Sequence, residues 1–229
     1  MMLAFAILFL TSGQAMAAAP DVTTNVVVYS LNGNGGANKN GNLGGRAGAD
    51  ALCLASGSKP TTGAVATTQY RALISVDAND EIRDMPTKYS LRTDQPIVGN
   101  YPAGSTIAIA SNVGALIAGP TLSNTMQTAT GATNVGYWTG SDNNGALVTN
   151  CSGWTSSTAG ALGQVGTHNV TTTGWLNGGW YYGTPSTDGD CSTLYNLLCV
   201  AFTPAVVNTV SAPLFSTKEK AAVFSEEVK

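Results

Sequence analysis

Residues 190–202 read DCSTLYNLLCVAF, a cysteine-bounded turn that leads into an apolar run. From Leu194 to Phe202 the run has the apolar content of a buried strand. Cys191 and Cys199 are separated by seven residues, and Cys53 and Cys151 complete an even set of four. An even set in an exported chain favours two disulfides, for which the sequence allows three connectivities. Zinc is disfavoured as an alternative, because no C-x2-C pair occurs.

The first 17 residues, MMLAFAILFLTSGQAMA, have the pattern of a secretory signal peptide. An apolar run at 3–10 is followed by an A-x-A pattern at 15–17, where signal peptidase could cut. The run is too short to span a membrane, which takes about 20 residues. The basic residues that usually open such a signal are absent before Lys39, and a buried N-terminal helix is the alternative interpretation. We expect a mature chain that is secreted, extracellular or at the cell surface, with the periplasm as a further location and no membrane span.

Charge is sparse in this chain of 229 residues, which has 10% charged residues, 27 glycines and a net charge of −3. This composition is typical of one compact, loop-rich domain, which we place at 18–203, with 204–229 as a C-terminal tail. No Lys or Arg occurs between Asp94 and Lys218. Since a nucleic-acid surface needs clustered basic residues, nucleic acid is excluded as a partner.

A strand, a glycine loop and a helix follow one another in 26–53, VVVYSLNGNGGANKNGNLGGRAGADALC. Dinucleotide sites are built in this order. Gly33 and Gly35 fit the fingerprint G-x-G-x-x-G, but Asn38 stands in the third place and no G-K-[ST] follows. We therefore interpret the loop as structural, with Ala49, Leu52 and Cys53 on the core face of the helix.

A set of short motifs in a fixed order resembles the C-type-lectin-like fold. The features are a cysteine on the first helix, a Trp-Thr-Gly turn in YWTGS at 137–141, and the C-x7-C spacing near the end. The chain is most similar to a bacterial, endostatin-like branch of secreted and surface proteins, most of them of unknown function. The similar stretches, which together cover about 26–202, are GNLGGRAGADALC at 41–53, YRALIS at 70–75, PIVGNYPAGSTIA at 96–108, NCSGWTS at 150–156 and LYNLLCV at 194–200.

The resemblance implies an α+β domain with mixed, mostly antiparallel sheets, one or two short helices, long loops and two disulfides. The nested pairing of such domains implies that Cys53 pairs with Cys199 and Cys151 with Cys191. It also implies that the glycine loop connects an edge strand to the first helix.

The middle of the chain carries weaker signals. Residues 70–76 alternate as in a strand, and the acidic stretch DANDEIRDM at 77–85 is typical of a solvated connection. The patches STIAIA and GALIAG within 101–136 indicate short strands. We expect Trp138 and Trp154 to be core residues.

No catalytic constellation stands out. The single histidine, His168, lies in the polar loop VGTHNVTTTG, where we expect it to be solvated, and a catalytic histidine needs a nucleophile and an orienting group. A glycosidase needs two carboxylates, for which only pairs such as Asp142 with Asp188 or Asp190 are available. We expect no enzyme, and a hydrolase on the same scaffold ranks third among the hypotheses.

Many C-type lectins bind sugar through a calcium ion that is held by Glu-Pro-Asn or Gln-Pro-Asp and by Trp-Asn-Asp. These tripeptides do not occur here. Asp142, Asp188 and Asp190 are the calcium candidates, since calcium takes six to eight oxygen ligands. The alternative is that they form Asx turns in exposed loops. We expect no cofactor, with calcium as the alternative.

Aromatic residues gather in TTTGWLNGGWYYGTPSTDGD at 171–190. Aromatic rings on glycine-rich loops give a binding surface a large contact area at little entropic cost. The predicted ligand-binding residues are Trp175, Asn177, Trp180, Tyr181 and Tyr182, and at least one of Trp175, Tyr181 and Tyr182 should be exposed. The alternative is that some rings are core, with Trp180 and Tyr182 on one face of a strand and Tyr181 on the other.

The resulting hypothesis is a secreted, non-enzymatic binding or adhesion module that recognises an extracellular protein or glycan through this long-loop region. The alternative is a structural subunit of a surface layer, matrix or filament, which would self-associate.

Overall fold

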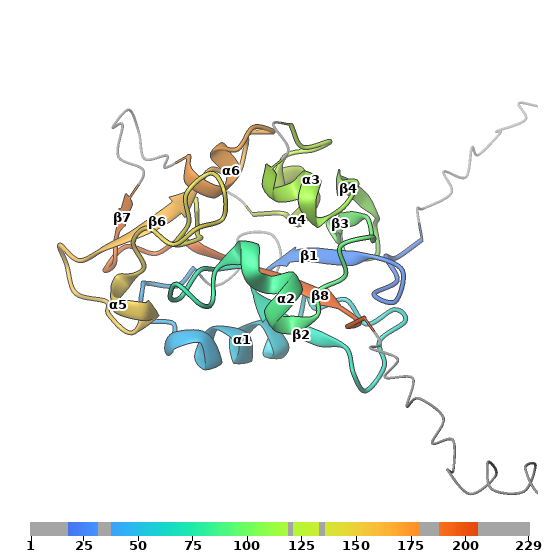
Figure 1. Ribbon diagram of the computed structural model, residues 1–229, viewed down its shortest axis with the longest axis horizontal. Coiled ribbons are helices and arrows are strands. Elements are labelled where there is room, and N and C mark those ends of the chain that lie inside the picture. The colour runs from blue at the N-terminus through green and yellow to red at the C-terminus, as the bar shows by residue number, and fades with distance from the viewer. Residues whose placement is uncertain (1–17, 32–37, 119–120, 133–135, 179–187, 206–229) are drawn as a thin grey trace, which may run out of the picture.

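The computed structural model describes residues 18–31, 38–118, 121–132, 136–178 and 188–205 (Figure 1). They form an α+β domain with a mixed sheet, short helices and two disulfides. The predicted signal peptide lies outside the described residues, as does the predicted tail apart from Pro204 and Ala205. None of the helices in the described ranges has both the length and the hydropathy that a bilayer crossing requires.

Eight strands form one sheet in the order β4-β3-β1-β8-β5-β6-β7, and β2 also pairs with β8. Most neighbouring pairs are antiparallel, whereas β1 is parallel to β3 and β5 is parallel to β8. The strands are β1 (Val26–Ser30), β2 (Gln69–Ala72), β3 (Ile97–Gly99), β4 (Ile107–Ala110), β5 (Tyr137–Trp138), β6 (Leu162–Gly166), β7 (Asp188–Asp190) and β8 (Asn196–Phe202).

The centre of the sheet is β8, as the apolar run at 194–202 predicts. All seven residues of β8 are buried, and β8 pairs with β1, β2 and β5. The expectation that the first strand is an edge strand is wrong, because β1 lies between β3 and β8. Its five residues are all buried, which suits a strand with neighbours on both sides.

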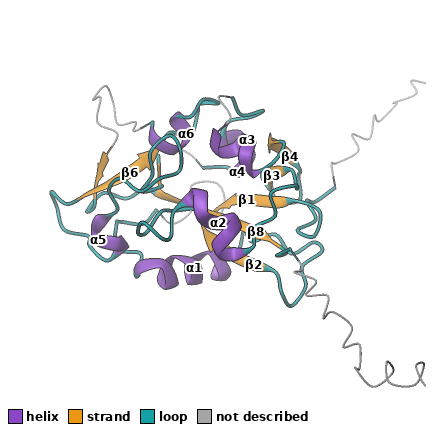
Figure 2. Cartoon of the chain, viewed as in Figure 1, coloured by secondary structure: helices purple, strands orange, loops and turns teal. Residues whose placement is uncertain are grey.

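The helices are short apart from the first (Figure 2). The expected GALIAG strand is instead part of a helix, because the Asn112 side chain accepts a hydrogen bond from the Ala115 amide and so caps its first turn. The helices are α1 (Gly45–Ala55), the 3-10 helix η1 (Ile82–Asp84), α2 (Met85–Tyr89), α3 (Val113–Ala118), α4 (Met126–Thr130), α5 (Cys151–Trp154) and α6 (Gly174–Asn177).

The sheet separates two hydrophobic clusters, and β1 contributes alternate residues to each. Val26 and Val28 pack with side chains from α2, α3, α4 and α6, whereas Val27 and Tyr29 pack with side chains from α1 and α5. This alternation follows from the period of two along a strand. In Figures 1 and 2, α1 and α5 lie below the central strands and α3, α4 and α6 lie above them.

The disulfide pairing is the one that the resemblance implies. Cys53 on α1 pairs with Cys199 on β8, and Cys151 on α5 pairs with Cys191. Trp138 and Trp154 are core residues, as predicted, and their rings meet edge to face with centroids 5.5 Å apart. Both disulfides therefore belong to the cluster on the α1 side of the sheet.

The acidic stretch at 77–85 is not a solvated connection, because Asp80 and Glu81 are buried. The Arg46 guanidinium on α1 donates to Asp80 through Nε at 3.0 Å and Nη2 at 2.9 Å, and the Tyr89 hydroxyl donates at 2.8 Å. Burial is the largest single influence on the pKa of Asp80 and would raise it, but the hydrogen bonds and charge of Arg46, the hydrogen bond from Tyr89 and the charge of Lys88 together lower the pKa. Through Asp80, which binds both Arg46 on α1 and Tyr89 on α2, this stretch holds η1 and α2 against α1.

Candidate functional site

The candidate site lies at one end of the sheet, where β8 and β5 begin and β6 ends. Tyr137 pairs with Asn196 on one side and with Gly166 on the other. An isolated bridge between Lys39 and Tyr195 adds one more segment on the far side of β8. We call this edge of the molecule the long-loop end, because segments 38–39 and 167–178 and the residue Tyr195 adjoin it.

At the long-loop end, α6 is fixed to the sheet by two hydrogen bonds. The Thr139 hydroxyl donates to the carbonyl of Leu176 at 2.7 Å, and the amide of Thr167 donates to the carbonyl of Gly174 at 3.0 Å. A Cβ atom at Gly166 would lie 1.9 Å from the carbonyl oxygen of Trp175, so only glycine permits this approach. The stretch 174–177 therefore folds as one helical turn against β6.

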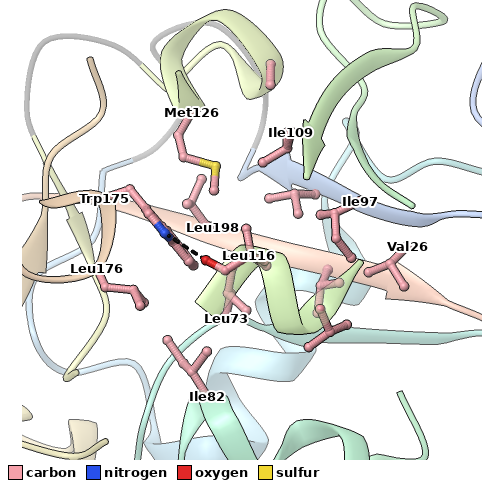
Figure 3. Close-up of a cluster of buried hydrophobic side chains, with 14 of the residues drawn as sticks. Val26, Leu73, Ile82, Ile97, Ile109, Leu116, Met126, Trp175, Leu176 and Leu198 are labelled. Carbon is pink, nitrogen blue, oxygen red and sulfur yellow. Dashed lines mark hydrogen bonds between the residues drawn. The ribbon is translucent and has the colours of Figure 1, made fainter. Parts of the chain in front are cut away.

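Trp175 is a core residue, which corrects the prediction that it binds ligand. Its exposed fraction is 0%, and its indole Nε1 donates to the carbonyl of Leu116 at 3.2 Å (Figure 3). The reason is that 174–177 forms a helix rather than an extended loop, and this turns the ring inward between α3 and the sheet. The other three predicted rings, Trp180, Tyr181 and Tyr182, lie outside the described residues.

Asn177 is the remaining predicted ligand-binding residue, and it is half-buried. Its Oδ1 atom is buried and has no hydrogen-bond partner among the residues that the structure describes. Thr167 Oγ1 and His168 Nδ1 share this property, and so does Asn38 Oδ1. In the described part of the chain the only other such atom is Gln95 Oε1. Four of five unpartnered atoms thus belong to residues of the long-loop end.

Thr167 and Asn177 are close neighbours across the junction of β6 and α6. Thr167 follows the last residue of β6, and a Cβ atom at Gly178 would lie 2.3 Å from Thr167 Oγ1. The hydroxyl of Thr167 therefore lies against the residue that follows Asn177. Asn38 lies three strands across the sheet from Thr167, beyond β5 and β8, which corresponds to about 14 Å at the usual spacing between strands.

His168 is buried, with an exposed fraction of 7%, so the expectation of a solvated loop histidine is wrong. Its carbonyl accepts a hydrogen bond from the amide of Gln127 at 2.8 Å, which holds the loop against α4. Burial lowers the pKa of the imidazole, so the neutral form is favoured at physiological pH. No hydrogen bond links this ring to a nucleophile or carboxylate among the residues that the structure describes.

Two of the calcium candidates have separate protein partners. Asp142 Oδ1 accepts hydrogen bonds from the amides of Asn144 at 2.8 Å and Ala146 at 2.9 Å. Asp188 Oδ1 accepts a hydrogen bond from the hydroxyl of Thr149 at 2.9 Å. Asp142 thus forms the Asx turn that was the alternative interpretation.

The third calcium candidate, Asp190, also stabilises a turn. It accepts hydrogen bonds from the amide of Ser192 at 2.8 Å and from that of Gly160 at 2.7 Å. Hydrogen bonds from Ser192 and Gly160 lower the pKa of this carboxyl. Across the described ranges, no three side chains of His, Cys, Asp or Glu come together as a group that could hold a metal ion.

The sequence interpretation missed Thr167 and misjudged His168. A signal was present, because two apolar residues flank this pair: Val165 is buried in the core, and the half-buried Val170 packs against it. Two polar residues that are flanked by packed valines indicate a segment that runs through the interior and not over the surface. Composition alone could not show that the pair has no partners there.

Comparison with known proteins adds no relative to this description. No protein-family model matches the chain, and no curated protein matches it. Function is therefore argued from the geometry of the long-loop end.

Proposed function

We propose that this chain is an exported, non-enzymatic binding module with a C-type-lectin-like fold, and that its long-loop end recognises an extracellular glycan or protein. The observation that carries the proposal is that Thr167, His168 and Asn177 each have a buried side-chain atom without a hydrogen-bond partner among the described residues. A buried polar atom without a partner costs about 1–3 kcal/mol, and native proteins contain few of them. If a ligand forms hydrogen bonds with these atoms, the cost of burying them is recovered on binding, which explains why the fold keeps them unpartnered at the long-loop end.

Export is supported by the N-terminal sequence and by the disulfides. The signal-like pattern at 1–17 directs a chain out of the cytoplasm. Two disulfides that involve all four cysteines suit an extracellular or periplasmic location, where disulfides form and persist. The nested pairing and the order of the motifs support the C-type-lectin-like fold.

A binding role is favoured over catalysis by the state of the reactive side chains. All four cysteines are oxidised, so none is available as a nucleophile. Among the described residues, neither a nucleophile nor an orienting group is hydrogen-bonded to the imidazole of His168, and a triad requires both. Buried, uncharged polar atoms that have no hydrogen-bond partner among the described residues are instead typical of a site that binds a ligand.

The proposal is tested by binding of the purified chain, with both disulfides formed, to an array of glycans and matrix proteins. We expect specific binding that Asn177→Ala abolishes. The matched control is Asn143→Ala, which removes the same side chain from an exposed turn. Binding that persists in Asn177→Ala, or no binding at all, contradicts the proposal. Large concentration-dependent species in size-exclusion chromatography would instead favour the assembly subunit.

A further inference from the structure

We infer that the free edge of β2 is a docking site for an extended peptide segment of a partner protein, and that this segment carries an acidic residue. The site is separate from the long-loop end, because β2 pairs with residues 199–202 of β8 and the long-loop end adjoins Asn196, where β8 begins. Three features support the inference, namely unpaired backbone groups at the strand edge, a groove beside them and an adjacent lysine.

The hydrogen bonds of β2 show which of its backbone groups point away from the sheet. The Leu73 amide, directly after β2, donates to the carbonyl of Leu198 on β8 at 2.9 Å. The Ala72 amide instead donates to the Asp50 side chain on α1, also at 2.9 Å. Because these directions alternate along an antiparallel strand, the amide and carbonyl of Tyr70 point to the same side as the Ala72 amide. In the described chain only β8 pairs with β2, so this side is a free edge.

Helix α1 covers this edge at Ala72 and leaves it open at Tyr70. The outward amide of Ala72 is bound to Asp50, and its carbonyl accepts a hydrogen bond from the Arg46 guanidinium at 2.8 Å. In Figure 1, α1 and β2 lie next to each other below the central strands. No described residue forms a hydrogen bond with the amide or carbonyl of Tyr70. Tyr70 thus offers one donor and one acceptor, which the backbone of another extended chain can pair with.

A groove of about 380 Å³ lies between α1 and β2, and Ala51, Leu54 and Tyr70 are among the residues that line it. Ala51 and Leu54 are exposed, so a partner can reach the groove from solvent. The two charged residues of the lining, Asp50 and Arg71, are paired with each other at 2.8 Å. The groove is therefore suited to an apolar side chain of the docked segment.

Lys59 places a positive charge beside this groove. Its Nζ atom lies 5.2 Å from the centroid of the ring of Tyr70, which lines the groove. Lys59 is half-buried, and no ion pair between described residues includes it. The other cations near β2, which are Arg46, Arg71 and Lys88, are each paired with an aspartate. A carboxylate of the docked segment complements Lys59, whereas a basic side chain there would be repelled.

An extended peptide matches the three features together. One edge of its backbone presents an amide and a carbonyl to those of Tyr70. Its alternate side chains point to the same face, so an apolar side chain in the groove and an acidic one toward Lys59 can belong to one short segment.

The test is an NMR titration of the nitrogen-labelled chain, with both disulfides formed, using the acetylated and amidated peptides Val-Leu-Val-Glu-Val and Val-Leu-Val-Lys-Val. We expect the glutamate peptide to shift the amide signals of Gln69, Tyr70 and Arg71. It should bind more tightly than the lysine peptide by about threefold or more, as expected for one exposed ion pair. Lys59→Glu should reverse this preference. Arg92→Glu, which makes the same change of charge in the loop after α2, is the matched control and should leave it unchanged.

Backbone pairing is tested by N-methylation of the glutamate peptide, which removes amide donors. One form is methylated at its second and fourth residues, and the other at its third and fifth. Because an added strand pairs through only one of its edges, one form should lose affinity by about fivefold or more and the other should retain it.

Each contrary result overturns the inference. If neither peptide binds, or if the shifts fall at the long-loop end and not on β2, the edge is not a peptide site. If the two methylated forms bind alike, whether well or not at all, no strand is added. If Lys59→Glu leaves the preference unchanged, Lys59 does not select an acidic residue. If the β2 signals depend on protein concentration without peptide, the occupant is a second copy of the chain. The proposed function is tested by Asn177→Ala and not by these variants, so the two can fail independently.

Discussion

Replacing Thr167 with valine should stabilise the protein, although most substitutions of buried residues destabilise. Thr167 is 3% exposed, and its hydroxyl has no hydrogen-bond partner in the described ranges of the chain. Burial of an unsatisfied hydroxyl costs about 1–3 kcal/mol, and valine replaces it with a methyl group of similar shape. We expect a gain of about 1 kcal/mol in the free energy of unfolding. For a domain of this size that is a rise of about 2–4 °C in Tm.

The matched control is Thr139→Val. Thr139 directly follows β5, which pairs with β6, just as Thr167 directly follows β6. Thr139 is also buried, but its hydroxyl donates to the Leu176 carbonyl at 2.7 Å and accepts from the Ser141 amide at 3.3 Å. Its removal should cost about 1–3 kcal/mol, because buried partners lose their hydrogen bonds. Urea unfolding with the disulfides intact measures both changes. If Thr167→Val destabilises as much as Thr139→Val, the Thr167 hydroxyl is satisfied and the argument for the site fails.

Three further predictions concern stability. Trp175→Ala should cost about 3–5 kcal/mol in thermal unfolding, as for an emptied core site, and a loss under 1 kcal/mol would show a surface ring. Removal of Cys53 with Cys199 should cost about 1 kcal/mol more than removal of Cys151 with Cys191, because the first pair closes the longer loop, 146 against 40 residues apart. Burial lowers the pKa of His168 in the folded chain. As the pH falls, the unfolded chain therefore takes up the imidazole proton at a higher pH than the folded chain does. Stability should therefore be highest above pH about 6.5 and fall as the pH drops, and His168→Gln should reduce that fall.

The central strand could be predicted because its signal lies within one short stretch, whereas the disulfide pairing is predicted from the resemblance to C-type-lectin-like domains. A strand buried on both faces must be apolar at consecutive positions, and NLLCVAF at 196–202 meets this condition. Once β8 is central, a cysteine within it can reach only a residue packed on its face. Cys53 on α1 is such a residue. Here the local composition and the tertiary arrangement carry the same information.

The short helices could not be predicted because contacts distant in sequence decide them. The four residues of α6 are too few for an intrinsically stable helix. They are held by hydrogen bonds from Thr139 and Thr167, which directly follow β5 and β6. Trp175 consequently faces the core, although an aromatic residue between glycines is equally compatible with an exposed loop. The sequence shows the ring but not the bonds that turn it inward.

Burial of polar residues is the least visible property in the sequence, and it separates structural residues from candidate functional ones. Asp80 and Thr167 are both buried within polar stretches that suggest solvated loops. Asp80 is fully partnered by Arg46, which is 34 residues away in the chain, and by Tyr89. The fold itself therefore explains why Asp80 is buried. No residue in the described part of the fold does the same for the Thr167 hydroxyl, and this difference is the reason why we propose a ligand at the long-loop end.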